Sequence, residues 1–186
     1  MKSRLSSLER DIALVAPDDP FTVVQAPLGP WQGITFHHSR IPRLPVWRVD
    51  YARAFNRFHY KKRKWEFGLG YHLLVTWDPD DHSHHRIQAS YRWVHQIPGA
   101  HAVNLLGRRV DGRIVEPNHE TIGICLVGDF ELRPPLSESY QVLAALTSGL
   151  RTRFDIPDRW LFRHDFFKDK ICPGQQFHIH EILGRM

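Results

Sequence analysis

Three segments of the chain carry the hydrophobic patterns of β-strands. Residues 33–39 read GITFHHS, in which the side chains alternate, so that His37 points to the opposite face from His38. Residues 69–77 (LGYHLLVTW) and 121–130 (TIGICLVGDF) are mostly apolar. Runs of this kind are typical of strands in the interior of a sheet. The chain is therefore predicted to contain a central β-sheet.

Two segments have the periodicity of amphipathic helices. Residues 49–62 place apolar side chains at helical spacing and run into the basic stretch 61–64, which suits a helix C-terminus. Residues 136–154 (LSESYQVLAALTSGLRTRF) predict a longer helix, with Ser137 as its N-cap. Helices and strands thus share the chain.

The remaining segments predict shorter elements. Residues 90–97 (SYRWVHQI) predict a third strand, residues 159–164 a short last strand, and residues 78–85 a loop. Residues 1–30 combine a short polar helix with a Pro-rich connector, and we expect them to form an arm packed on a single domain of residues 31–186. Strands and helices interleave without a strict alternation, so the predicted fold is α/β with a mixed central sheet.

Composition and charge narrow the classes of protein. The 186 residues are 42% hydrophobic and 12% aromatic, as expected for one globular domain rather than a disordered chain. The formal net charge of +5 favours an anionic partner such as nucleic acid, a membrane surface or an acidic cell-wall polymer. The basic run at 61–64 is not part of an aromatic–basic motif of the kind that binds nucleic acid, so a solvated helix end is its simplest interpretation.

Cysteine usage and the N-terminal sequence add exclusions. Cys125 and Cys172 are the only cysteines, which excludes a disulfide framework and a four-cysteine zinc site. The sequence has neither the apolar core of a signal peptide nor a stretch long enough to cross a membrane. We therefore expect synthesis in the cytoplasm and no membrane insertion.

The segment 163–174 (RHDFFKDKICPG) carries the first candidate chemistry. His164 and Cys172 flank Lys170 in a charged loop that ends in a Pro-Gly turn. Taken alone, Cys172 is more simply a buried thiol. A lysine and a histidine nearby would, however, favour the thiolate that binds metals. A catalytic zinc site needs three protein ligands and an open position for water, so a third ligand must come from elsewhere.

A histidine on the strand at 33–39 is the candidate for this third ligand. His37 shares its face with two hydroxyl side chains, whereas His38 shares its face with two apolar ones. We therefore expect His37 to face a polar site and His38 to pack in the interior. With 13 histidines in the chain, spacing alone leaves other combinations open.

Five segments in this order resemble the zinc-dependent N-acetylmuramoyl-L-alanine amidases of type 2, the family that includes phage lysozyme amidases and peptidoglycan recognition proteins. They are ITFHHS (34–39), GLGYHLLV (68–75), GAH (99–101), NHETIGICLVGDF (118–130) and RHDFFKDKICPG (163–174). The resemblance implies a mixed sheet flanked by helices, with one zinc ion in a groove on one side.

The resemblance also assigns roles to individual residues. It places the three zinc ligands at His37, His164 and Cys172. It places Tyr71 beside the zinc-bound water and Lys170 opposite the scissile carbonyl. The remaining two positions are groove residues that would contact the substrate; they are His101 and Asn118.

The function implied is hydrolysis of peptidoglycan between N-acetylmuramic acid and L-alanine. The compact chain and its basic charge suggest a monomeric phage or prophage endolysin that reaches the wall after release, with no nucleic acid as partner. Two alternatives share the fold: a recognition module that binds peptidoglycan without cutting it, and a regulator that binds a protein partner. Loss of the cysteine ligand is the usual sign of the recognition branch, so Cys172 argues against that alternative.

The chain departs from the family pattern at the walls of the groove, and its cysteines indicate which branch of the family it resembles. The chain carries extra sequence near 78–86 and 104–117, where the family's groove has its walls. Cysteine at both 125 and 172 is similar to the phage and recognition-protein branch rather than the cytosolic recycling enzymes. Simpler interpretations remain for other residues: Cys125 as a core side chain, His72 as a packed histidine, and the histidines at 82–85 as a solvated loop.

Overall fold

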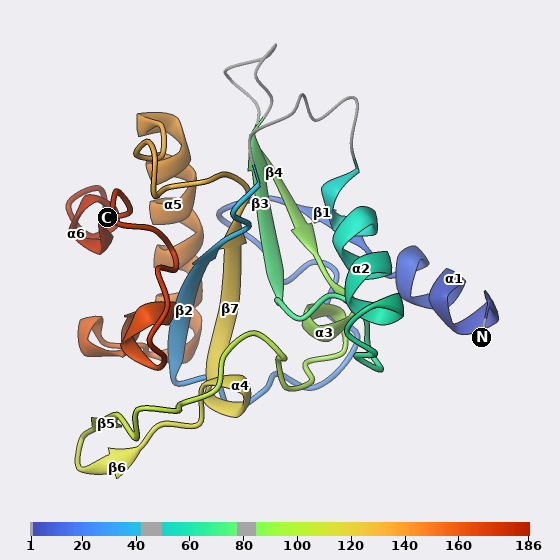
Figure 1. Cartoon of the computed structure of the whole chain (residues 1–186), viewed down its shortest axis with the longest axis horizontal. Coiled ribbons are helices and arrows are strands. Elements are labelled where there is room, and N and C mark those ends of the chain that lie inside the picture. Colours follow the sequence, from blue (N-terminus) through green and yellow to red (C-terminus); the bar gives the residue numbers. More distant parts are fainter. Residues whose placement is uncertain (1, 42–49, 78–84) are drawn as a thin grey trace.

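A six-stranded mixed sheet in the order β1-β4-β3-β7-β2-β8 forms the centre of the computed structural model, which describes residues 2–41, 50–77 and 85–186 (Figure 1). Strands β2, β7 and β8 run parallel, as do β3 and β7, whereas β4 is antiparallel to both β3 and β1. The strands are β1 (Ala13–Val15), β2 (Gly33–His38), β3 (Leu73–Trp77), β4 (His85–Ala89), β7 (Thr121–Leu126) and β8 (Leu161–Arg163). The mixed sheet flanked by helices confirms the predicted fold class.

Helices lie on both faces of this sheet, with α5 and α6 on one side and α2 on the other (Figure 1). A separate two-stranded hairpin, β5 (Arg109–Val110) and β6 (Arg113–Ile114), projects beyond one end of the sheet. The α-helices are α1 (Lys2–Arg10), α2 (Tyr51–Lys61), α3 (Tyr91–Val94), α4 (Pro117–Glu120), α5 (Ser137–Phe154) and α6 (Ile179–Leu183), with 3₁₀ turns η2 (Asp158–Trp160) and η3 (His164–Phe166). No α-helix among these described segments has the length and apolarity needed to span a bilayer.

The two faces of the sheet have different roles. Phe36 pairs with Ile124 and lies on the face that packs against the buried side of α5, which forms the main core. On the other face His37 is in register with Cys125, and Cys125 belongs to a small buried cluster with residues of α2. Because side chains alternate along a strand, His37 points to the α2 side and away from the main core.

Two local predictions are wrong. Residues 90–97 contain the helix α3 instead of a strand, because the Ser90 side chain caps it by accepting a hydrogen bond from the Arg92 N–H. The Arg92 guanidinium then donates to the Leu69 carbonyl at 3.0 Å. At α5 the N-cap is Leu136, and Ser137 is the first helical residue and makes no capping bond. The loop predicted at 78–85 lies, except for its last residue, outside the described residues.

The N-terminal segment contacts the rest of the chain at several points. Leu8 in α1 is buried, and β1 pairs with the last three residues of β4, Ile87 to Ala89. The Trp93 indole N–H donates to the carbonyl oxygen of Pro20 at 2.7 Å, which fixes the connector. The division into an arm and a catalytic domain at residue 30 stays a prediction.

The hairpin β5–β6, which forms residues 109–114 of the second insertion, is fixed to the rest of the protein. The Asp111 carboxylate accepts hydrogen bonds from Arg159 at 2.9 Å and from the Trp160 indole at 3.0 Å. The Arg113 guanidinium lies 4.7 Å from the centre of the Trp160 ring, a cation–π contact. These contacts hold the hairpin in a fixed position against η2.

Candidate metal centre and active site

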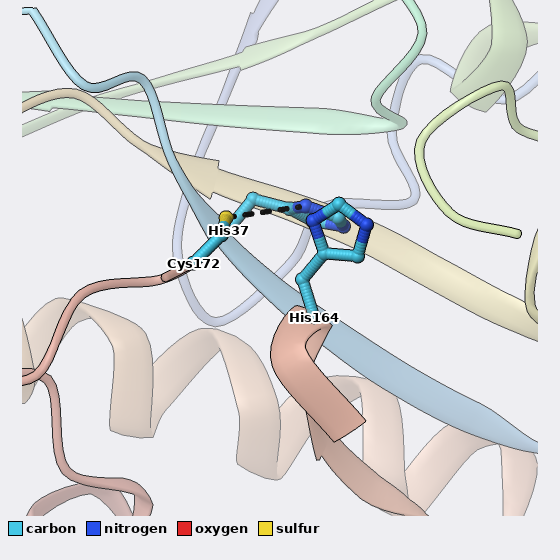
Figure 2. A group of neighbouring side chains, drawn as sticks. All are labelled: His37, His164 and Cys172. Atoms are coloured by element: carbon cyan, nitrogen blue, oxygen red, sulfur yellow. Dashed lines mark hydrogen bonds between the residues drawn. The ribbon is translucent and has the colours of Figure 1, made fainter. Parts of the chain in front are cut away.

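Three potential metal ligands converge on the α2 side of the sheet (Figure 2). His37 lies near the end of β2, His164 begins η3, and Cys172 lies in the loop that follows. One donor atom from each residue falls within 4.8 Å of the other two. The Cys172 Sγ atom lies 3.9 Å from His37 Nδ1. These are the three residues that the resemblance assigns to zinc.

The topology of the sheet explains this convergence. Strands β2 and β8 are parallel neighbours, so their carboxyl ends meet at the same edge. His37 comes at the end of one strand, and His164 comes directly after the other. The Cys172 carbonyl then accepts a hydrogen bond from the Asp165 N–H at 2.8 Å, which returns the loop to the turn that carries His164.

Arg163 holds the same loop in place. Its guanidinium donates to the Asp165 carboxylate at 2.6 Å and to the Gly174 carbonyl at 3.0 Å, and it also donates to the Phe177 carbonyl. These bonds join the turn before Cys172 to the chain after it. The sequence does not predict this role, because nothing in the spacing of Arg163 indicates which carbonyls it reaches.

The residues fit a zinc ion. Zn–N and Zn–S bonds of about 2.0–2.3 Å in a tetrahedral site require donor atoms to be roughly 3.5 Å apart. The Cys172 Sγ and His37 Nδ1 atoms are 3.9 Å apart, and all three donor atoms lie within 4.8 Å of one another, so small side-chain movements would bring them to a common ion. Burial lowers the pKa of His164 to about 4 and that of His37 well below 6.5, so both rings are neutral at pH 7, as metal ligands must be.

The third ligand differs from expectation in one respect. Burial raises the pKa of the Cys172 thiol to about 11, an effect larger than the opposite one of Lys170. The positive charge of Lys170 does favour the thiolate, as predicted, but burial outweighs it and raises the pKa of Cys172 in the metal-free chain. A metal bound here at neutral pH must displace the thiol proton.

Tyr71 borders the cluster. Its ring centre lies 5.0 Å from that of His37, and its phenol is hydrogen-bonded to the Cys125 side chain. Burial raises the pKa of Tyr71 well above 10, so the phenol keeps its proton at neutral pH. Cys125 itself is fully buried beside α2, which confirms its interpretation as a small core residue.

Lys170 is exposed and belongs to the loop that carries the cysteine ligand. Its carbonyl oxygen accepts a hydrogen bond from the Cys172 N–H at 3.1 Å. After burial, the Lys170 charge is the largest cause of the lowered pKa of His164. A lysine is thus present near His164 of the metal cluster.

His101 and Asn118 lie next to each other. His101 is only 7% exposed, and its Nδ1 atom lies 3.1 Å from His37 Nε2. The Asn118 side-chain oxygen accepts from the N–H groups of His101 and Ala102 at 2.8 and 3.0 Å. Asn118 also lines an apolar cavity together with Val103 and with Ile114, which belongs to the second insertion. Contact of either residue with substrate stays a prediction.

Of the two histidines expected to turn away from the site, His38 does so, whereas the expectation for His72 is wrong because its ring lies on the site side of the sheet, 5.7 Å from that of His101. His38 Nδ1 accepts a hydrogen bond from the Phe130 N–H at 3.3 Å, on the side of the main core. His72 is fully buried between the Gly123 N–H at 2.9 Å and the Ile97 carbonyl at 3.1 Å. Both are packed, hydrogen-bonded histidines, as predicted.

Comparison with known proteins identifies the family. A family model described as N-acetylmuramoyl-L-alanine amidase matches residues 27–175, which include all the ligand candidates. The chain belongs to the N-acetylmuramoyl-L-alanine amidase family. A search of curated protein sequences gave no match.

Solved structures of amidases and recognition proteins share the fold. The endolysine N-acetylmuramoyl-L-alanine amidase LysCS from Clostridium intestinale is 24% identical, with a TM-score of 0.58 over 86% of this chain and 87% of that one. Drosophila PGRP-LB is 21% identical, with a TM-score of 0.58 over 87% and 83% of the two chains. Human PGRP-IBETAC in complex with glycosamyl muramyl pentapeptide is 17% identical, with a TM-score of 0.61 over 84% and 86%. The amidase fold thus hosts both enzymes and binding proteins.

Proposed function

We propose that this chain is a zinc-dependent amidase that cleaves peptidoglycan between the lactyl group of N-acetylmuramic acid and L-alanine. The observation that carries the proposal is the convergence of His37, His164 and Cys172, with one donor atom from each within 4.8 Å of the others. A cluster of two neutral imidazoles and one thiol has the composition of a catalytic zinc site with room for water. Membership of the amidase family supports the same reaction.

A zinc ion in this cluster supplies a Lewis acid and a water nucleophile that is active at neutral pH. The protonated phenol of Tyr71 can orient the attacking water or pass on its proton. The ammonium group of Lys170 can stabilise the negative charge that develops on the carbonyl oxygen of the scissile amide. These roles are the ones that the family resemblance implies, and the contact of Tyr71 with His37 supports the first of them.

Peptidoglycan is the proposed partner, and a complex of the human relative with a muramyl pentapeptide supports this choice. Asn118, at the cavity lined by the second insertion, is the proposed substrate contact outside the metal cluster. We further propose a monomeric phage or prophage endolysin that is made in the cytoplasm and acts on the wall after release. The likeness to an endolysine from Clostridium intestinale supports this assignment.

The alternative is a module that binds peptidoglycan without cutting it. Structural neighbours described as peptidoglycan recognition proteins favour it, because the fold alone does not separate the two functions. The presence of Cys172 beside both histidines favours the enzyme. A site that only binds the polymer has no need of a complete ligand set.

Mass spectrometry of purified peptidoglycan incubated with the protein tests the proposal. We expect free stem peptides that begin at L-alanine, no such peptides with a zinc chelator, and their return when zinc is added. An intact polymer that still retains the protein in a pull-down would identify a recognition module instead. Products cut at another bond would show that the substrate assignment is wrong.

A further inference from the structure

His101 connects the His37 ring to the main chain. Its Nδ1 atom lies 3.1 Å from His37 Nε2, and its Nε2 atom lies 3.2 Å from the Thr121 carbonyl oxygen. His37 Nδ1, on the opposite side of the first ring, is the atom that faces Cys172 at 3.9 Å. The order from main chain to metal cluster is therefore Thr121, His101, His37.

The chemistry of the groups fixes the direction of both hydrogen bonds. A carbonyl oxygen only accepts, so His101 must carry its proton on Nε2 to bond to Thr121. Only one hydrogen can lie between His101 Nδ1 and His37 Nε2, which are 3.1 Å apart, and an imidazole that binds a metal is neutral and carries one N–H only. His101 Nδ1 is then an acceptor, and the proton of His37 must be on Nε2. This arrangement leaves the lone pair of His37 Nδ1 free for the metal.

The surroundings of His101 are shaped for this ring. A Cβ atom added at Gly99 would lie 2.3 Å from the His101 ring, and one added at Gly123 would lie 2.5 Å from it. Only glycine allows the main chain to approach the imidazole so closely from both segments. The Asn118 side-chain oxygen accepts a hydrogen bond from the main-chain N–H of His101 and so holds this residue from a third direction. The ring is thus kept in one orientation by three separate parts of the chain.

We propose that His101 is a positioning residue that fixes the tautomer and orientation of His37, so that Nδ1 is presented to zinc before the metal arrives. The inference rests on the proposed zinc site but concerns a residue that does not touch the metal. It also assigns His101 a role other than substrate contact, since both of its ring nitrogens are already bonded.

The test compares His101→Leu with His101→Asn, two side chains of similar size. Asparagine keeps an acceptor near the position of Nδ1, whereas leucine removes it. We expect the zinc affinity of the leucine variant, measured by competition with a chelating dye, to fall by about 10- to 100-fold, the usual effect of losing the partner of a metal-bound histidine. The asparagine variant should remain within a few-fold of the unaltered chain. His72→Leu, which removes an equally buried histidine with no bond to a ligand, serves as the control.

Nitrogen-15 NMR of the histidine rings in the zinc-free, unaltered chain provides an independent reading. We expect His37 to be a single tautomer with its proton on Nε2, and to become a mixture in His101→Leu. A proton on Nδ1 in the unaltered chain, or leucine-variant zinc affinity within about twofold of normal, would overturn the inference. If the unaltered chain bound no zinc, the proposed function would fail, while the tautomer of His37 would still decide the role of His101.

Discussion

The Sγ atom of Cys172 lies 3.9 Å from Nδ1 of His37, although 135 positions separate the two residues in the sequence (Figure 2). One residue lies on an interior strand of the sheet, and the other lies in a loop held by Arg163 and Asp165. The metal cluster therefore forms only when the C-terminal loop has docked on the sheet. Zinc binding should accordingly stabilise the folded chain, since the unfolded chain keeps these ligands apart.

Cys172→Ser should abolish stoichiometric zinc binding and lower kcat/KM by about two orders of magnitude or more, because a catalytic metal supplies several kcal/mol of transition-state stabilisation. Metal content by elemental analysis and peptide release from peptidoglycan check the two effects. Cys125→Ala is the matched control and should retain one zinc per chain, because Cys125 packs beside α2 outside the ligand set. Full activity with bound zinc in the serine variant would remove Cys172 from the ligands.

Lys170→Ala should keep zinc and lower kcat by roughly 100-fold, the usual effect of removing one group that stabilises an oxyanion. Lys168→Ala provides a control with the same charge change on the same loop, and we expect it to retain most of its activity. The measurement is steady-state release of stem peptides by protein with verified metal content. An unchanged kcat in the Lys170 variant would contradict the role assigned to this ammonium group.

Arg163→Lys should lower the free energy of unfolding by about 2 kcal/mol, because one ammonium group cannot reproduce the bonds of the guanidinium to a carboxylate and two carbonyls. Zinc affinity should fall as well, since these bonds hold the chain on both sides of Cys172. Urea denaturation with and without zinc measures both quantities. The control is Arg153→Lys on α5, which replaces an exposed arginine and should change neither the free energy of unfolding nor the zinc affinity. Equal stability and zinc affinity of the two variants would show that the Cys172 loop does not depend on Arg163.

Acid should destabilise the fold partly through His72. Burial lowers the pKa of His72 to about 3 in the folded chain, whereas an unfolded histidine has a pKa near 6.5. Between these values the unfolded chain binds the extra proton. The contribution of His72 is thus complete above pH 6.5 and is lost as the pH falls toward 3, at about 1.4 kcal/mol per pH unit.

His72→Gln tests this, because glutamine can accept from Gly123 and donate to Ile97 without titrating. Urea denaturation of metal-free protein between pH 7 and pH 4.5 should give a shallower loss of stability for the variant than for the unaltered chain. The variant's lower stability at pH 7 does not affect the comparison, which concerns the slope. Equal slopes would mean that His72 is not kept neutral in the folded state.

The sequence predicted those features that depend on a local period. Alternation in residues 33–39 separated His37 from His38 correctly, because neighbours on a strand face opposite sides. The prediction of a strand failed at residues 90–97. Their β-branched and aromatic residues are typical of a strand, but the Ser90 side chain caps and thereby stabilises a helix. The bonds from His101 to His37 and Thr121 could not be predicted, since they join three segments through tertiary contact. Gly99 and Gly123 are the local hint in the sequence that the main chain approaches another group closely here. Only the structure shows that this group is the His101 imidazole.

The pairing of β1 with β4 has a consequence for self-association. β1 covers three of the five residues of β4, Ile87 to Ala89. Without β1, the main-chain N–H and C=O groups along the outer side of all five residues would lack a neighbouring strand and would form a template on which a second molecule could add a strand. With β1 in place, the sheet ends in a strand of three residues, too short to serve as such a template. The N-terminal segment therefore covers the β4 edge of the sheet and disfavours edge-to-edge association of two molecules at high concentration.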